Sequence, residues 1–511
     1  MGSSQKIVSG VLWSTLFNIV NAVYSFVAVP ILIGYFGKSQ YGLIGLAMSI
    51  NVYMRLMDMG FNSTNVRFFS TWLAEHNLDK VRKAFQTSLS FYGFIGLING
   101  LILLGVSFFS DSIFNVSPEQ DVILKHLFYI LAVVAFCNWF SSCFDQIIKS
   151  TENVGWILRR QMIPKALQIL VLAATVIIGF SIETYYVLTC LATLSIIPLS
   201  IRKIRKETPF VSFIPKLHWP TLKEMLPYSL NIFSFSLFQF SFYHLRPVFL
   251  GMQGTIESVA DYRILNGIIG LVHILASSFL PVLLPSAAKV KARNDRKAYY
   301  RVAYDGTKYI SIVLCFATFG IMTIGPDLLS VYVGEEYLYL IPWFNLWLVC
   351  NLVTHNQAIS SLILAGSDIR AISYSSIVAS IVGLVSSWLL IPHYQVGGVV
   401  IGFAFYGAVQ MLFYYLYYWP RKMQISSWRV LCRSFGPYVL LGCVGYGISR
   451  LLPDLGFHWL NIPVQGSLFF IIFVVVTWLL STNDDRTFYI SIIKHRKSIS
   501  PSSISPNQIQ E

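Results

Sequence analysis

Charged residues are scarce in this sequence, since Asp, Glu, Lys and Arg supply only 12% of its 511 residues. Soluble domains carry roughly twice that share, and a soluble chain of this length needs several domains with charged surfaces. Apolar residues supply 55% instead. Because a spanning helix needs about 20 mostly apolar residues, this content allows about fourteen spans at most. The composition excludes a soluble enzyme and predicts an all-α polytopic membrane protein.

Sequence motifs for enzymatic chemistry are also missing. A phosphate-binding loop needs G-x-x-x-x-G-K-[ST]. Gly37-Lys38-Ser39 matches only the end of that motif, because Leu32 stands where the first glycine is required. The chain has no H-E-x-x-H, no G-x-S-x-G and no His or Cys cluster with metal-ligand spacing. We therefore expect no enzyme, no catalytic residue, no cofactor and no metal site.

Disulfide chemistry is not indicated either. The seven cysteines form no C-x-x-C pair and lie in or near apolar runs, and their odd number argues against a disulfide framework. The first apolar run is too long for the core of a cleaved signal peptide, so the first helix should stay in the protein.

Apolar runs bounded by charge clusters predict fourteen transmembrane helices. The longest connections hold about 25 residues, too few for a folded catalytic domain. The predicted spans lie at 8–33, 41–60, 87–109, 122–145, 163–180, 185–201, 225–250, 259–283, 309–325, 339–364, 371–391, 398–419, 435–452 and 464–481.

The positions of basic residues predict the orientation. Most of the 37 Lys and Arg fall in segments that are cytoplasmic if the N-terminus is cytoplasmic, for example Lys149, Arg159, Arg160 and Lys165 in the segment 146–165. Positive residues mark cytoplasmic loops, so we predict that both termini are cytoplasmic. The net charge of +14 then needs no nucleic acid as a partner.

A short pattern recurs in the two presumed halves. Pro30-Ile-Leu-Ile-Gly34 ends the first span and Pro247-Val-Phe-Leu-Gly251 ends the seventh. Chance could produce the pentapeptide alone, but its position after six helices favours a repeat, and transporters often place the substrate between such repeats. Each pattern follows a span with buried amides, and these polar cavity candidates are Asn18, Asn21, Asn231 and Gln239.

Ionisable residues inside spans are the main functional candidates, because a charge at the bilayer centre costs about 2.5–3.5 kcal/mol and needs a partner or water. Basic groups outnumber acids among them, which favours an anionic passenger, since Arg binds phosphate bidentately. Candidate substrate-binding residues are Arg55, Arg246, Arg263 and His244, and candidate ion-coupling residues are Asp58, Asp261 and His273.

Structural alternatives remain open for these candidates. Arg55 and Asp58 lie three residues apart on one helix face and could form a local ion pair. Arg246 or Arg263 could pair with Asp261, and His273 could be a satisfied core histidine instead of a proton relay.

Three local patterns carry a resemblance to a known family. The second span closes with Leu56-Met-Asp58-Met-Gly60 and runs on to Arg67-Phe-Phe. The eighth ends in Phe279-Leu-Pro281-Val-Leu-Leu-Pro285-Ser-Ala-Ala-Lys289, and the turn after the eleventh reads Leu390-Ile-Pro392-His-Tyr-Gln-Val-Gly397-Gly398. Over about residues 8–480 the chain resembles the Wzx-type polysaccharide flippases of the multidrug/oligosaccharidyl-lipid/polysaccharide exporter superfamily. Val399 and Val400 depart from the alanine that is usual there.

The resemblance implies a MATE-like architecture of two six-helix lobes in a V around a central cavity. The N-lobe would be 1–201 and the C-lobe 225–419, joined by the basic cytoplasmic linker 202–224. Two extra helices would occupy 420–481, and 482–511 would be a disordered cytoplasmic tail.

The resemblance also implies a function. Relatives flip an oligosaccharide on polyprenyl pyrophosphate, such as a repeat unit of O-antigen in lipopolysaccharide, of capsule or of exopolysaccharide. They do so across the bacterial inner membrane by alternating access. Expected partners are this lipid-linked oligosaccharide, membrane lipids, a coupling proton or sodium ion, and the polysaccharide polymerase machinery.

Three alternatives stay open on the sequence. A multidrug-type small-molecule antiporter has a similar architecture, although spans 1 to 6 offer few buried acids. A peptidoglycan lipid-precursor flippase would transport a substrate of the same chemical kind. A membrane-embedded glycan polymerase is less favoured, because the outer loops are short.

Overall fold

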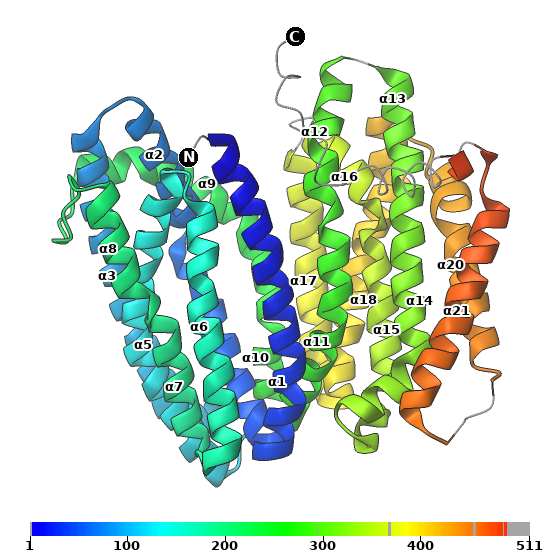
Figure 1. The fold of residues 1–511 in the computed structure, drawn as a ribbon, viewed down its shortest axis with the longest axis horizontal. Helices are drawn as coiled ribbons and strands as arrows, with labels where there is room; N and C mark the ends of the chain where they lie inside the picture. Colours follow the sequence, from blue (N-terminus) through cyan, green and yellow to red (C-terminus); the bar gives the residue numbers. More distant parts are fainter. Residues whose placement is uncertain (1–2, 294, 366–368, 453–455, 484, 488–511) are drawn as a thin grey trace, which may run out of the picture. The chain divides into compact units, whose positions relative to one another are not determined.

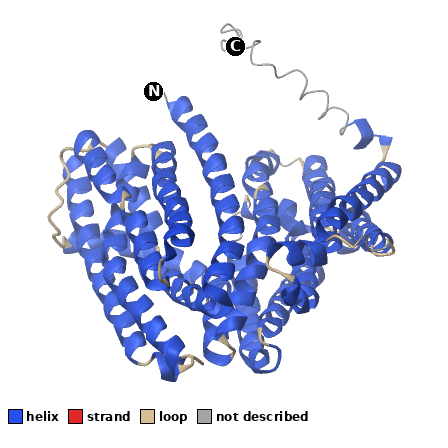
Figure 2. Ribbon diagram, turned by 60° about the horizontal axis from the view of Figure 1, so that its bottom comes forward, coloured by secondary structure: helices blue, strands red, loops and turns tan. Residues whose placement is uncertain are grey.

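The computed structural model of the protein describes residues 3–293, 295–365, 369–452, 456–483 and 485–487. These residues form helices joined by turns and short loops, and none of them forms a strand (Figure 2). The all-α prediction is therefore confirmed for this part of the chain. Most of the tail predicted to be disordered, 488–511, lies outside the described residues.

The helices gather into two units. The predicted division into an N-lobe and a C-lobe stays a prediction. Unit 1 comprises Met1–His273, Tyr339–Cys350 and Asp368–Tyr418, and unit 2 comprises Ile274–Leu338, Asn351–Ser367 and Trp419–Glu511.

Unit 1 holds the N-terminal helices and two helices from the later part of the chain. Within it α3 packs along α5, α1 along α6 and α17 along α18 (Figure 1). Its elements are α1 (Ser3–Tyr53), η1 (Met54–Asp58), α2 (Phe61–Ala74), α3 (Leu78–Phe108), α4 (Ser110–Ile113), α5 (Pro118–Ser150), α6 (Val154–Ala174), η2 (Thr175–Gly179), α7 (Ile182–Leu194), α8 (Ile196–Glu207), α9 (Trp219–His244), α10 (Arg246–Gln253), α17 (Ile369–Tyr394) and α18 (Val396–Leu412).

Unit 2 is built around α14, which packs against α20 and α21. Its elements are α12 (Phe279–Ala292), α13 (Arg296–Arg301), η3 (Val302–Gly306), α14 (Thr307–Tyr332), η5 (Leu352–Asn356), α16 (Gln357–Leu364), α19 (Ser427–Arg429), η7 (Val430–Phe435), α20 (Gly436–Ser449) and α21 (His458–Leu480). Four further elements contain residues of both units, namely α11 (Ile256–Ser277), η4 (Glu335–Leu340), α15 (Ile341–Asn351) and η6 (Phe413–Met423).

Glycine and capping residues set the helix ends that separate the first spans. Gly37 has φ 79° and ψ 164° inside α1, a conformation that glycine adopts without steric cost. It lies between the first two predicted spans, 8–33 and 41–60. Ser117 and Gln120 form a capping box at the start of α5, with Pro118 in its first turn.

Eleven segments of described residues are long and apolar enough to cross a membrane. One of them, Leu16–Asp58, covers most of both of the first two predicted spans. The predicted spans at 225–250 and 435–452 fall on α9 with α10 and on η7 with α20, which are not among the eleven. A multi-pass membrane protein is therefore confirmed, whereas the number of fourteen spans is not.

Aromatic side chains fill the core of the N-terminal helices in unit 1. Phe61 stacks on Phe91 with ring centroids 4.0 Å apart, and Phe85 stacks on Phe144 at 6.4 Å. Tyr92 is fully buried in the same cluster. Close packing of this kind holds α2, α3 and α5 in a fixed arrangement around the polar groups described next.

Candidate functional site

All of the candidate residues predicted from the sequence lie in unit 1. The ionisable ones come from three short stretches of chain, at η1, at the junction of α9 and α10, and along α11. η1 carries Arg55 and Asp58, the junction carries His244 and Arg246, and α11 carries Asp261, Arg263 and His273.

Arg246 is buried within a cage of aromatic rings. Its side chain belongs to a residue that is only 3% exposed. Neither Nε nor Nη1 has a hydrogen-bond partner among the described residues. The five rings around the guanidinium lie 4.9 to 5.8 Å from it and belong to Phe242, Tyr243, Tyr262, Trp347 and Phe403. Cation–π attraction stabilises the charge in this cage but leaves the N–H groups of these two nitrogens without acceptors.

Arg263 is half-buried on α11 and packs against the second part of α1. Its guanidinium lies 4.8 Å from the ring centroid of Tyr41, and Nη1 lies 3.7 Å from the sulfur of Met48. A β-carbon at Gly45 would lie 2.5 Å from Cδ of Arg263, so glycine at this position makes room for the arginine. No carboxylate of the described chain forms an ion pair with Arg263.

Arg55 and His244 complete the predicted basic set. The Arg55 side chain is exposed. His244 is half-buried and interacts electrostatically with the charges of Arg246 and Arg55. The ring of His244 lies 4.1 Å from that of Phe240. Within the described residues, Arg55 does not pair with Asp58, and neither Arg246 nor Arg263 pairs with Asp261. The ion pairs left open by the sequence are therefore not formed.

Asp58 instead ends a chain of side-chain hydrogen bonds that links four helical elements. The Tyr92 hydroxyl donates to Asp58 Oδ1 at 2.6 Å and accepts from Gln146 Nε2 at 2.6 Å. Asn65 Nδ2 donates to Gln146 Oε1 at 2.6 Å, and Ser88 Oγ donates to Asn65 Oδ1 at 2.9 Å. Of these residues, only Asp58 was a candidate from the sequence, because its partners are ordinary polar residues that lie far apart along the chain.

Asp261 pairs with Lys38, which the sequence did not suggest as a partner. Lys38 Nζ lies 2.7 Å from Asp261 Oδ1, and the Tyr339 hydroxyl lies 2.7 Å from both carboxylate oxygens. The contact joins the turn after Gly37 to α11 and η4 within unit 1. The carboxylate is well buried, with its side chain 7% exposed.

Lys165 is a cation that sequence reasoning missed, because it was counted among the cytoplasmic charges. The structure places it in α6, one residue after Pro164, with its side chain half-buried. Nζ lies 4.3 Å from the ring centroid of Tyr24 and donates to Gln168 Oε1 at 2.9 Å. The charge of Arg263 also acts on Tyr24. The two cations therefore share a tyrosine neighbour.

The remaining candidates have exposed side chains. His273 lies with its ring 6.2 Å from that of Tyr243, and the charge of Arg246 acts on it. The predicted polar cavity residues Asn18, Asn21, Asn231 and Gln239 are exposed on α1 and α9. Their assignment to a cavity stays a prediction.

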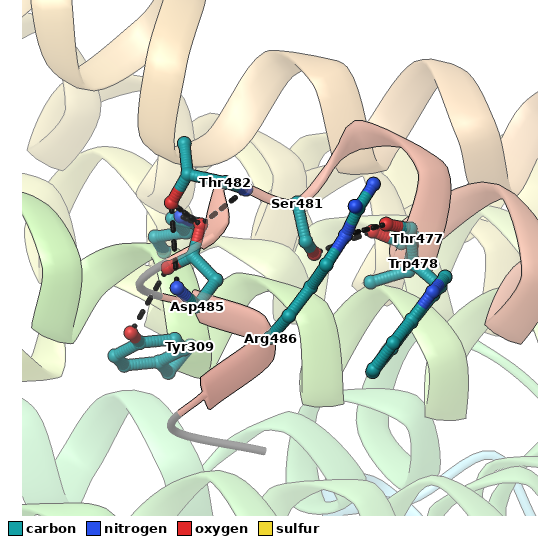
Figure 3. Close-up of polar contacts among 8 residues, drawn as sticks. Tyr309, Thr477, Trp478, Ser481, Thr482, Asp485 and Arg486 are labelled. Atoms are coloured by element: carbon teal, nitrogen blue, oxygen red, sulfur yellow. Dashed lines mark hydrogen bonds and ion pairs between the residues drawn. The ribbon is translucent and has the colours of Figure 1, made fainter. Parts of the chain in front are cut away.

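Other charges buried in the protein do have acidic partners. In unit 1, Arg160 is 3% exposed, and its Nη2 lies 2.7 Å from Asp145 Oδ1. In unit 2, Lys308 of α14 pairs with Asp485, which follows α21. Figure 3 shows the same carboxylate accepting from the Tyr309 hydroxyl at 3.1 Å and from the Thr482 hydroxyl at 2.6 Å. Burial works to raise the pKa of Asp485, but these hydrogen bonds and Lys308 lower it to about 2.

The described residues were also compared with the requirements of a metal site. Among the described residues, no group of three or more His, Cys, Asp or Glu side chains is placed to hold a metal ion. The polar groups of unit 1 can bind anions through arginine and lysine, and can hold or release protons at Asp58, Asp261 and the histidines.

Solved structures with the same fold are membrane transporters. The chain aligns with the structure titled "Lipid II flippase MurJ, inward closed conformation" with a TM-score of 0.70 at 15% identity, covering 91% of this chain and 99% of that one. An inward-facing multidrug resistance MATE family transporter of the MOP superfamily aligns at 0.63 and 13% identity, covering 84% and 96%. The MATE multidrug transporter DinF-BH aligns at 0.57 and 16%, covering 82% and 96%. These likenesses define the class: the protein has the fold of MurJ and MATE transporters.

The family follows from the sequence match. The family described as "Polysaccharide biosynthesis protein" matches residues 7–291, which is more than half of the chain. The chain therefore belongs to this family, and the predicted membership of the polysaccharide flippase group is confirmed. No curated protein matches the chain.

Proposed function

We propose that the protein flips a polyprenyl-pyrophosphate-linked oligosaccharide across the bacterial inner membrane, as a transporter and not as an enzyme. The observation that carries this proposal is that Arg55, Arg246 and Arg263 in unit 1 form no ion pair with an acid of the described chain. Membership of a polysaccharide biosynthesis family and the MurJ-like fold support a glycan on a lipid carrier as the passenger.

The unpaired arginines suit a pyrophosphate. An unpartnered cation inside a membrane protein is costly, and that cost is offset when an anion binds to it. Arginine stays charged when desolvated and binds phosphate oxygens through two parallel N–H groups. Nε and Nη1 of Arg246 are donors without acceptors among the described residues. In this proposal Lys165, close to Tyr24, joins the predicted basic residues on the path of the headgroup.

Transport by alternating access needs contacts that form and break. We assign such a role to Lys38, Asp261 and Tyr339, whose contacts would open when the path opens on that side. A carboxylate that loses its lysine can take up a proton, so Asp261 is a candidate for coupling transport to a proton gradient. Asp58 and His273 remain the other coupling candidates.

The proposal is tested by Arg246→Gln and Arg263→Gln, singly and together, in a strain that depends on this gene for a surface glycan. We expect the double variant to lower surface glycan more than tenfold at unchanged protein level, with lipid-linked oligosaccharide accumulating inside. Arg82→Gln, which removes an exposed arginine paired with Asp79, serves as the matched control. Normal surface glycan in the double variant would overturn the site.

The same strain distinguishes two other candidate substrates from a lipid-linked oligosaccharide. The likeness to MurJ favours a peptidoglycan lipid precursor as second candidate, and the likeness to MATE transporters favours a small-molecule drug as third. Loss of the protein would then block cell-wall synthesis or raise drug sensitivity while surface glycan stays normal. Reporter fusions at each end of the chain test the predicted cytoplasmic termini, and co-purification tests the polymerase machinery as a partner.

A further inference from the structure

Unit 2 contains an open pocket of about 500 Å³ whose lining includes none of the candidate residues of unit 1. It forms where α12 ends, α13 begins and η6 ends. Such a volume falls within the range of small-molecule and headgroup sites. The side chains that define its chemistry are Lys291, Arg296, Tyr299, Tyr300, Met423 and Gln424.

The charge inside this pocket is available to a ligand. Lys291 and Arg296 have exposed side chains, and neither forms an ion pair with a described acidic residue. Asp295 also lines the pocket, but its carboxylate accepts the backbone N–H of Ala298 at 3.0 Å as the N-cap of α13. One oxygen of this carboxylate is thus engaged with the backbone, and two cations line the pocket.

The walls of the pocket are tied to each other within unit 2. The Tyr299 hydroxyl donates to the carbonyl of Met423 at 3.5 Å, and the backbone N–H of Ser426 donates to the Tyr304 hydroxyl at 2.9 Å. The guanidinium of Arg429 lies 5.5 Å from the ring centroid of Tyr304. These contacts hold the segment after η6 against α13 and η3, so the pocket exists before any ligand binds.

The surroundings favour a ligand that belongs to the membrane. Trp428, four residues beyond Gln424, is 73% exposed, and exposed tryptophans are typical of the membrane–water interface. Further basic residues accompany the pocket in sequence, namely Lys289, Arg293, Lys297, Arg301, Arg421 and Lys422. These residues lie in two segments, one along α12 and α13 and one at the end of η6, and both segments are predicted to be cytoplasmic. Basic pockets on that side of a membrane protein attract anionic headgroups.

We propose that this pocket binds the phosphate-bearing headgroup of an anionic membrane lipid. Arg296 and Lys291 would pair with the phosphodiester, and the hydroxyls of Tyr299 and Tyr300 would contact the polar remainder of the headgroup. The same phosphate chemistry is found in soluble phosphate esters, so the source of the phosphate has to be tested directly. The site is independent of the proposed flippase site, which lies in unit 1.

The experiment measures binding of the purified full-length protein to lipids by native mass spectrometry and by thermal shift, with phosphatidylglycerol or phosphatidylcholine as the probe. We expect preference for phosphatidylglycerol, and Lys291→Gln with Arg296→Gln should weaken it about tenfold. The matched control is Arg293→Gln with Lys297→Gln, which removes the same charge from the same segment outside the pocket. Less than a twofold effect is expected from it.

Three outcomes would overturn the proposal. Equal weakening by the two double variants would show diffuse attraction by the basic surface. Equal binding of both lipids would show that the net negative charge of the headgroup is not selected. Equal stabilisation by millimolar glycerol phosphate would assign the pocket to a soluble ester. Because these measurements need no transport, their failure leaves the flippase proposal standing, and failure of the flippase proposal leaves them valid.

Discussion

Arg246 and Arg263 of unit 1 and the buried Lys308 of unit 2 differ in their partners. Lys308 faces Asp485, and that carboxylate also accepts from Tyr309 and Thr482. Arg246 faces five aromatic rings, and Arg263 faces Tyr41 and Met48, with no acid for either in the described chain. A paired charge stabilises a fixed arrangement, whereas an unpaired one is ready for an external anion. The difference separates structural charges from candidate binding charges.

The largest effect is expected at the paired site. Lys308→Met leaves Asp485 buried without its cation, which should lower the free energy of unfolding by about 3–5 kcal/mol. Unfolding of the purified protein in detergent by heat or denaturant provides the measurement. Lys308→Met combined with Asp485→Asn should recover at least half of the loss, because the stranded charge is gone. A loss no larger than that of Arg82→Gln would contradict the assignment of this pair.

The pH dependence of unfolding should report the same pair. The pKa of Asp485 in the folded protein is about 2, below its ordinary value of 3.8. Its contribution is therefore fully present above pH 4 and is lost as the pH falls towards 2, by at most about 2 kcal/mol. Asp485→Asn removes this dependence. Stability curves of the variant and the parent should converge at the acid end, and a constant gap down to pH 2 would refute the assignment.

A smaller effect is expected where unit 1 has its own pair. Lys38→Met removes the cation from Asp261, but Lys38 is 25% exposed and water can replace part of its interaction, so about 1–2 kcal/mol should be lost from the contact. A cysteine in place of Ser39 would report opening through its labelling rate with a membrane-impermeant maleimide. We expect labelling to rise several-fold in the Lys38→Met background. An unchanged rate would mean that the contact does not hold this side closed.

The smallest change in stability is expected at Arg246. Arg246→Gln loses cation–π attraction but also removes an unpaired buried charge, and these effects oppose each other. The free energy of unfolding should stay within about 1 kcal/mol of the parent while transport is lost. If Arg246→Gln destabilises the protein as much as Lys308→Met does, Arg246 is structural and the comparison between the two regions fails.

The sequence predicted the parts of the structure that depend on local pattern. Apolar runs located the helices, and Gly37 separates the first two spans as expected from the run lengths. Charge counting singled out Arg246 and Arg263 without any knowledge of their neighbours. Long-range partners could not be predicted, because nothing near Asp261 indicates Lys38, which is more than 200 residues away. Lys165 was missed because a lysine at the start of a predicted span resembles one in a cytoplasmic loop.

The chain of hydrogen bonds that starts at Asp58 has one direction throughout. Ser88 donates to Asn65, Asn65 to Gln146, Gln146 to Tyr92, and Tyr92 to the carboxylate. The other carboxylate oxygen accepts the backbone N–H of Asn62 at 3.0 Å, at the start of α2. A proton arriving on Asp58 must weaken one of these two bonds. If the proton binds Oδ1, it disturbs the row of side chains that runs through α2, α3 and α5. If the proton binds Oδ2, it loosens the first turn of α2.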